Sequence, residues 1–486
     1  MKHGSILIGA LTLVTLFLQV PRHCYSQGGP QAKKQVPVQQ QAAMGRRSEP
    51  HTPDPVPFRS KDGKITGWKV AVPGGRPLAT PAVADGKVFV GGGFGSHEFY
   101  AFDAATGKRL WTYQTADDGP TAAVVEDGLI AFNTESCELE IITTNGKPVW
   151  KKWLGDPLMS MPAIEGGSVY MAYPDSRGDR KHYVAAFDLK TGKELWKQPI
   201  PGEIITAPIV NEQRVYLATL EGALFSFDRS GKLLWQEKKN ATSAPAVWNQ
   251  HCYFSRREET SLNRAGKTVK QQNEVVAARG TAPASLTRAI QPTFRVADYL
   301  DYAKRAGSLR EQASEALDVA VGFGGANKGD AKIMQSRVNL GLATVHGVWA
   351  YQGSKPFIDN GRLFSSMGDV LQSVDPKTEK VLWKRTLHEN KKESELLDSV
   401  LTPPAIVNGK VFVGTAFGEI IAVSAQSGEL QWKAEIGEPV VFQPVVSKGR
   451  VYVSTANGSL YCLNTGDGRD DGWLMWGANA THNGLH

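Results

Sequence analysis

The stretch AFDAATGKRLW, residues 101–111, returns almost unchanged as AFDLKTGKELW at 186–196, and both fit the pattern A-x-D-x-x-T-G-K-x-x-W. SFDRSGKLLW and SVDPKTEKVLW are weaker copies further along the chain. The tryptophans of these and related segments recur about every 40 residues, at 111, 150, 196, 235, 383 and 432. A strand-rich repeat of this length is typical of β-propeller blades.

Each repeat opens with a small residue, usually Pro, followed by two or three apolar residues and a turn. The eight openings begin at Pro81, Ala123, Pro162, Pro208, Pro245, Pro356, Pro404 and Pro444. Most turns contain DG, GG or NG, which supply the positive φ angles of a two-residue hairpin. In the fifth repeat we align LNRAGKTVKQ (262–271) with FDRSGKLLWQ (227–236), so that this repeat lacks its Trp. The sequence therefore predicts an all-β, eight-bladed propeller of four-stranded antiparallel blades.

The repeated motif has a mechanical interpretation. The Asp at its third position can accept backbone N–H groups of the following turn, the Gly supplies a positive φ, and the Trp can pack against the neighbouring blade. The residues assigned to this docking role are Asp103, Gly107, Trp111, Trp150, Asp188, Gly192, Trp196, Trp235, Trp383 and Trp432. ITGWKVAV (65–72) resembles a lone fourth strand, and we expect it to complete the last blade and close the ring.

The ends of the chain have different compositions. Lys2 and the 15-residue apolar run Ile6–Val20 predict a signal peptide over 1–26, with an uncleaved signal anchor as the alternative. Pro21-Arg22-His23 precedes Cys24, so lipidation is not expected. Residues 27–64 form a Gln/Pro-rich segment that we expect to be a disordered linker. The propeller is expected over 65–476 and a C-terminal tail over 477–486.

A long insertion is expected between repeats five and six, over residues 273–345. Ser308 and Glu311 form a capping box, and the residues after it follow helical spacing up to Gly322. This part of the insertion is predicted to be helical, packed on the propeller or, alternatively, on a partner.

Several classes of function are excluded by composition. The net charge of +7 is spread along the chain without a basic stripe carrying interleaved aromatic residues, so nucleic-acid binding is not expected. No CxxC motif occurs, which argues against a zinc ribbon or an attached c-type haem. The three cysteines beyond the signal, Cys137, Cys252 and Cys462, are interpreted as small buried hydrophobic residues, with a functional thiol as the alternative.

The lengths of the connections distinguish two faces. The turns joining strands one to two and three to four are short and share one face, which we name the short-turn face. The other connections share the opposite, variable-loop face, where the length varies at 92–98, 173–182, the insertion and 388–399. Binding residues tend to gather on variable loops over a rigid scaffold, although solvated side chains or packing under the insertion would give the same pattern. The predicted binding residues are His97, Glu98, Arg177, Asp179, Arg180, His182, His346, Trp349, Tyr351 and Lys355.

The A-x-D-x-x-T-G-K-x-x-W pattern resembles the tryptophan-docking motif of quinoprotein-type propellers, also called PQQ-binding-like repeats. One branch of that family is similar to the outer-membrane assembly factor BamB and implies a non-catalytic scaffold. The other branch contains PQQ-dependent dehydrogenases, many with paired cysteines that this chain lacks. The resemblance, which fixes fold and not function, leads us to expect a non-catalytic scaffold without a cofactor. The alternatives are a PQQ-dependent dehydrogenase that uses PQQ and Ca²⁺, and a propeller that binds another small ligand, such as a sugar at the ring centre.

The BamB resemblance together with the signal implies a place in the periplasm or outer cell envelope, either free or tethered by the N-terminal segment. We expect an envelope protein as partner, no transmembrane span once the signal is cleaved, and a monomeric propeller.

Overall fold

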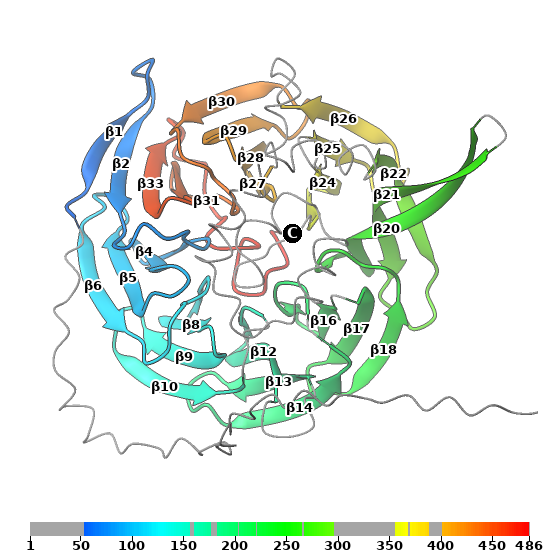
Figure 1. The fold of residues 1–486 in the computed structure, drawn as a ribbon, viewed down its shortest axis with the longest axis horizontal. Coiled ribbons are helices and arrows are strands. Elements are labelled where there is room, and N and C mark those ends of the chain that lie inside the picture. The colour runs from blue at the N-terminus through cyan, green and yellow to red at the C-terminus, as the bar shows by residue number, and fades with distance from the viewer. Residues whose placement is uncertain are drawn as a thin grey trace, which may run out of the picture. The chain divides into compact units, whose positions relative to one another are not determined.

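A computed structural model describes residues 53–485 except 156–159, 176–181, 203, 220, 265–266, 296–354, 368–369 and 388–400. Eight antiparallel sheets stand around a common axis, each running from an inner strand to an outer one (Figure 1). The predicted eight-bladed propeller is therefore confirmed. The signal peptide, the helical part of the insertion and most of the N-terminal linker lie outside the described residues.

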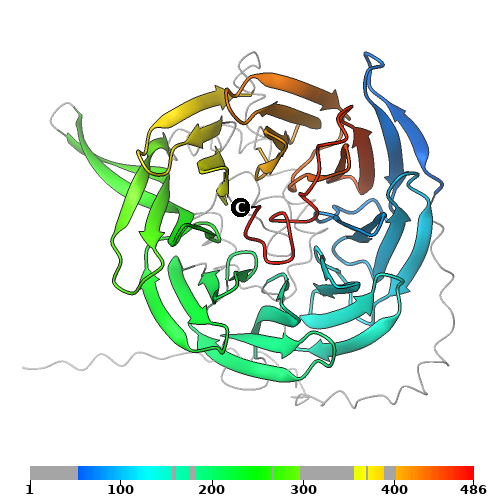
Figure 2. The ribbon, with the colours of Figure 1, turned by 180° about the vertical axis from the view of Figure 1, so that it is seen from behind.

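The innermost strand of each blade is short and lines the axis, as the turned view also shows (Figure 2). These strands are β3 (Ala82–Ala84), β7 (Val124–Glu126), β11 (Ala163–Glu165), β15 (Ile209–Val210), β19 (Ala246–Trp248), β23 (Phe357–Asp359), β27 (Ala405–Val407) and β31 (Val445–Ser447).

The second and third strands form the middle of each blade. Outside the long hairpin of blade five they are mostly buried along their length, because each blade packs between two neighbours. The second strands are β4 (Lys87–Gly91), β8 (Leu129–Asn133), β12 (Ser168–Pro174), β16 (Arg214–Ala218), β20 (His251–Arg264), β24 (Arg362–Met367), β28 (Lys410–Gly414) and β32 (Arg450–Ser454). The third strands are β5 (Glu98–Asp103), β9 (Glu138–Thr143), β13 (His182–Asp188), β17 (Ala223–Asp228), β21 (Lys267–Gly280), β25 (Val370–Val374), β29 (Glu419–Ser424) and β33 (Ser459–Asn464).

The outermost strands are the most exposed, since they form the rim of the ring. They are β6 (Arg109–Gln114), β10 (Pro148–Trp153), β14 (Glu194–Ile200), β18 (Leu233–Lys238), β22 (Thr287–Arg295), β26 (Val381–Thr386), β30 (Leu430–Glu435) and, in the last blade, β2 (Thr66–Ala71).

Ring closure joins the two ends of the propeller. Strand β2 pairs with β33, with Trp68 opposite Cys462, so the predicted role of residues 65–72 is confirmed. A further strand, β1 (Val56–Arg59), pairs with the outer edge of β2, and Phe58 packs edge-on against Tyr461. The prediction of a disordered linker up to residue 64 is therefore wrong at its end, because the open edge of β2 offers backbone partners to the preceding residues.

The tryptophans of the outer strands dock on the next blade. The Trp150 indole N–H donates to the Leu189 carbonyl at 2.8 Å, and its ring covers Gly192. In the same turn Asp188 accepts bonds from the backbone and hydroxyl of Thr191, which lower the pKa of Asp188. The equivalent indole-to-carbonyl bonds join Trp68 to Ala104, Trp111 to Thr144, Trp196 to Arg229, Trp235 to Thr281 and Trp383 to Ala425. Trp432 occupies the same place in β30, near Phe412 of its own blade.

We expect Gly192→Ala to destabilise the propeller by about 1–3 kcal/mol more than Gly167→Ala does. Both glycines lie in blade three at similar positive φ, +70° and +74°, so both substitutions carry the same backbone strain of about 1–2 kcal/mol. A Cβ at residue 192 would lie 2.8 Å from the Trp150 ring, whereas one at residue 167 would meet nothing within 4 Å. Chemical denaturation of both variants measures the difference, and equal losses would show that the indole contact is unimportant.

Blade five departs from its predicted register. Strands β20 and β21 pair over their whole lengths, from His251 opposite Gly280 to Arg264 opposite Lys267. The alignment of 262–271 with the third-to-fourth turn is therefore wrong, and residues 273–295, expected to begin the insertion, lie in β21, β22 and the turn between them. The extra length of this blade lies in the long β20–β21 hairpin, which a search for a 40-residue period cannot detect.

Arg288 stands where the other blades have tryptophan. Arg288 lies opposite Ala278 across the β21–β22 pair, just as Trp235 lies opposite Ser226 across the β17–β18 pair of blade four. Its guanidinium donates to the Pro376 carbonyl at 3.0 Å and lies 3.1 Å from the Glu379 carboxylate. Glu379 has a φ of +61° and replaces the glycine of the docking turn. A charged pair thus replaces the Trp–Gly contact between blades five and six.

Candidate functional site

The C-terminal segment, Trp473–Leu485, lies at the ring axis rather than outside the propeller (Figure 1). Residues 477–486 were predicted to be a tail, and that prediction is wrong. Ala478, Ala480, His482 and Asn483 are all buried. The misprediction has a physical reason: small and polar residues resemble a solvated tail in the sequence, but their backbone groups pair with the inner strands.

Five inner strands hold this segment by hydrogen bonds, in blades one, three, four, five and eight. In each case the bonded residue comes two positions after the opening proline. The bonds join Val83 to Leu474, Ile164 to Ala480, Val210 to Thr481, Val247 to the Asn483 side chain, and Val446 to Trp473. Because these residues immediately precede the short turns, the segment closes the channel at its short-turn end.

Trp476 fills the centre of the channel. It is 1% exposed and belongs to an apolar cluster that includes Ala79, Ala122, Met161 and Ala207, which precede the inner strands of four blades. Three of these four places hold alanine, which leaves room for one large indole among them. The axis is therefore occupied by the chain's own side chains at this level.

Two ionisable groups are buried beside Trp476. Lys355 is fully buried, and its ammonium nitrogen donates to the Pro245 carbonyl and lies 5.0 Å from the Phe357 ring centre. Burial lowers the pKa of Lys355 well below its usual value. The two ring nitrogens of His482 lie 2.8 Å from the Trp476 and Pro162 carbonyls, and burial lowers the pKa of His482 to about 4.

Lys355 was predicted to lie on the variable-loop face, and the structure corrects this. Residue 355 immediately precedes the opening proline of blade six, and a side chain at that place is directed toward the interior of the ring. The sequence did not reveal this because a lysine in a connecting segment is usually solvated.

On the variable-loop face the described residues form a small polar group near blade one. Glu98 accepts a hydrogen bond from the Ser96 hydroxyl at 2.6 Å, and the His97 carbonyl accepts one from the Thr115 backbone. His182 begins β13, the equivalent strand two blades further along the chain. Arg177, Asp179, Arg180, His346, Trp349 and Tyr351 lie outside the described residues.

Among the described residues, the hairpin of blade five is the longest extension on the variable-loop face. The connection between β20 and β21, at residues 265–266, is a second-to-third connection and belongs to this face. Figure 1 shows the hairpin extending beyond the rim of the ring. The equivalent strands of blade four, β16 and β17, have 5 and 6 residues, compared with 14 each here.

A PQQ–Ca²⁺ site would need a cluster of oxygen ligands. Within the described part of the chain no group of three or more His, Cys, Asp or Glu side chains could hold a metal ion. Cys137, Cys252 and Cys462 are buried on three different blades, and burial raises the pKa of Cys252 and Cys462 to about 12. The described residues also contain no helix with the length and apolarity needed to cross a membrane.

Curated relatives match parts of the chain only. BamB of Nitrosomonas eutropha is 24% identical over 37% of this chain and 47% of its own length. Lupanine 17-hydroxylase [cytochrome c] of a Pseudomonas species is 33% identical over 26% of this chain and 21% of its own length. The chain thus spans less than half the length of these relatives.

Solved structures agree on the fold. BamB of Moraxella catarrhalis superposes with a TM-score of 0.51 at 14% identity, covering 82% of this chain and 96% of that one. A quinohemoprotein alcohol dehydrogenase of Pseudomonas putida HK5 superposes with a TM-score of 0.51 at 14% identity, and the match covers 82% of this chain and 76% of the dehydrogenase. A family model described as outer membrane protein assembly factor BamB matches residues 58–142, 138–309 and 352–479. The chain therefore belongs to the family that carries this description.

Proposed function

We propose that the protein is an exported, non-catalytic propeller that binds protein partners in the cell envelope through its variable-loop face. The observation that carries this proposal is the hairpin of β20 and β21, which ends in a second-to-third connection of that face and extends beyond the rim of the ring as a two-stranded arm (Figure 1). Exposed backbone along a strand can pair with a strand of another chain. Family membership supports an assembly role, and the signal-like residues 1–26 support export.

The ring axis supports the same proposal. Trp476 and the segment around it occupy the short-turn end of the channel, which leaves the outer faces as the larger surfaces available to a partner. A PQQ-dependent dehydrogenase is the second candidate, favoured by the 33% identity to lupanine 17-hydroxylase and to the quinoprotein ethanol dehydrogenase of Pseudomonas aeruginosa.

The arm can be shortened with a connection that the chain already uses. Thr415–Gly418 (TAFG) joins β28 to β29 in blade seven at the place that residues 256–274 occupy in blade five. We expect a variant with TAFG in place of 256–274 to keep its propeller fold, which circular dichroism measures. Crosslinking in its own cells, followed by quantitative mass spectrometry, should show that this variant no longer retains envelope proteins that the unaltered chain retains.

Retention of the same partners by the shortened variant would contradict the role of the arm. Titration with PQQ and Ca²⁺, followed by a dye-linked alcohol oxidation assay, separates the two candidates. Saturable binding with turnover would overturn the scaffold proposal.

A deletion that tests the insertion has to begin after Arg295, because residues 273–295 contain strand residues of blade five.

A further inference from the structure

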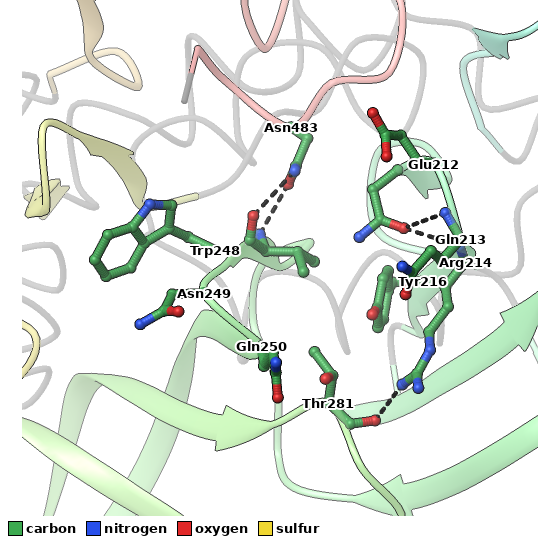
Figure 3. A pocket seen from close by; sticks show the side chains of 11 residues that line it. Glu212, Gln213, Arg214, Tyr216, Trp248, Asn249, Gln250, Thr281 and Asn483 are labelled. Carbon is green, nitrogen blue, oxygen red and sulfur yellow. Dashed lines mark hydrogen bonds between the residues drawn. The ribbon is translucent and has the colours of Figure 1, made fainter.

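A hollow of about 410 Å³ opens on the short-turn face between blades four and five (Figure 3). Trp248 lies on one side of it, and Glu212, Gln213 and Arg214 lie on the other. Asn483, from the C-terminal segment, holds the backbone of Val247 at its edge through two hydrogen bonds of 2.8 and 3.0 Å. A hollow of this size is within the range that holds small-molecule ligands, about 300–1,000 Å³.

The two turns that line the hollow break the pattern of the repeat. Six of the eight openings have glycine at the sixth position, and the two exceptions are Gln213 and Gln250. Both glutamines line the hollow. Trp248 is likewise the only tryptophan at the fourth position of an opening. These three departures from the opening pattern are therefore gathered at one place.

One of these departures carries backbone strain. Asn249 and Gln250 have φ angles of +45° and +58°, and the second is a conformation that glycine adopts at much lower cost. The strain at a non-glycine residue in this region is about 1–2 kcal/mol. Non-glycine residues held in a strained backbone conformation that glycine would relieve are frequently functional. The Gln250 side chain is exposed in the hollow, and this accounts for a glutamine rather than a glycine at the strained position.

The framework of the hollow is fixed by contacts on its outer side. The Arg214 guanidinium donates to the Thr281 carbonyl, which also accepts the Trp235 indole N–H at 2.7 Å. Trp248 packs against the apolar cluster between blades five and six, and a Cβ added at Gly361 would lie 3.7 Å from its ring. Its ring is half-buried, so it can present apolar surface from a fixed position.

We propose that this hollow binds a neutral saccharide. An aromatic ring offers a flat apolar surface with a polarised π-system to the C–H face of a sugar ring. Asn and Gln amides each provide both donors and an acceptor, which matches hydroxyl groups that donate and accept in turn. The charged side chains of the lining, Glu212 and Arg214, are of opposite sign, which favours an uncharged ligand.

Isothermal titration of the full chain with maltotriose, cellotriose and chitotriose tests the proposal, with a neutral acetylated tripeptide as the competing class. We expect one saccharide to bind with a Kd of about 1 mM or tighter. Gln250→Gly restores the usual glycine and relieves the strain, so we expect unchanged or raised thermal stability together with about tenfold weaker binding. Trp248→Ala should abolish binding, while Trp153→Ala, at an exposed indole on blade two, should not change it.

Three results would overturn the proposal: no saccharide of the panel binding at about 10 mM, binding that survives both Trp248→Ala and Gln250→Gly, or binding of the tripeptide instead. If Trp248→Ala fails to fold, Gln250→Gly alone decides, since it is expected to be folded. Because the hollow and the β20–β21 arm lie on opposite faces, loss of saccharide binding and loss of protein partners can be measured in separate variants.

Discussion

A chain that ends at Gly472 is expected to lose cooperative folding, because residues 473–486 supply part of the propeller core. Trp473 and Trp476 are 0% and 1% exposed. Removing one buried tryptophan side chain costs about 3–5 kcal/mol, and the whole free energy of unfolding of a domain is about 5–15 kcal/mol. The truncation also leaves inner-strand N–H groups such as those of Val83 and Ile164 without their carbonyl partners.

A synthetic peptide of residues 473–486 provides the matched test. Added in excess to the truncated chain, it should restore the thermal transition, because it replaces the same side chains and hydrogen bonds. A peptide with Ala in place of Trp476 should restore less. A truncated chain that melts like the full-length protein would show that the segment rests on the propeller without stabilising it.

Trp68→Ala is the second change with a large expected effect, about 3–5 kcal/mol of unfolding free energy. Trp68 is 6% exposed, donates to the Ala104 carbonyl at 3.3 Å and covers Gly107. It lies in β2, the strand that closes the ring against β33. Loss of its side chain weakens both the docking on blade one and the seam between the ends of the propeller.

Trp383→Ala separates these two effects. Trp383 is 8% exposed, donates to Ala425 at 2.9 Å and covers Gly428, so it docks in the same manner without lying in the closing strand. Both variants should lose comparable stability, but only Trp68→Ala should speed amide hydrogen exchange in β2, which opens locally when its anchor is lost. Equal exchange of β2 in both variants would show that closure does not depend on Trp68.

The predictable parts of the molecule are those set by local pattern. The apolar strands and short turns define eight blades, the docking tryptophans mark seven of them, and ITGWKVAV identifies the closing strand. Blade five was counted, but its later strands were misplaced, because Arg288 and Glu379 form a salt bridge where the other blades have Trp and Gly. Two charged residues far apart in sequence do not indicate a docking contact until the fold brings them together.

The candidate sites could likewise be predicted from the sequence only in part. Loop length identified the variable-loop face, including His97 and Glu98, but placed Lys355 there although it is buried near Trp476. None of the residues lining the short-turn hollow was singled out from the sequence. Their one signal was the replacement of the opening glycine by Gln213 and Gln250, which is visible once the openings are aligned.

The sequence by itself determined the number of blades and the order of strands, because each blade repeats a hydrophobic pattern and a turn that act over a few residues. The tertiary structure alone decided what fills the axis and which blade extends an arm. Those outcomes depend on contacts between distant residues, such as Asn483 with Val247 and Trp476 with Ala79. The repeated AFDxxTGKxLW segments build the ring, whereas the residues that depart from the repeat distinguish this propeller from others of its family.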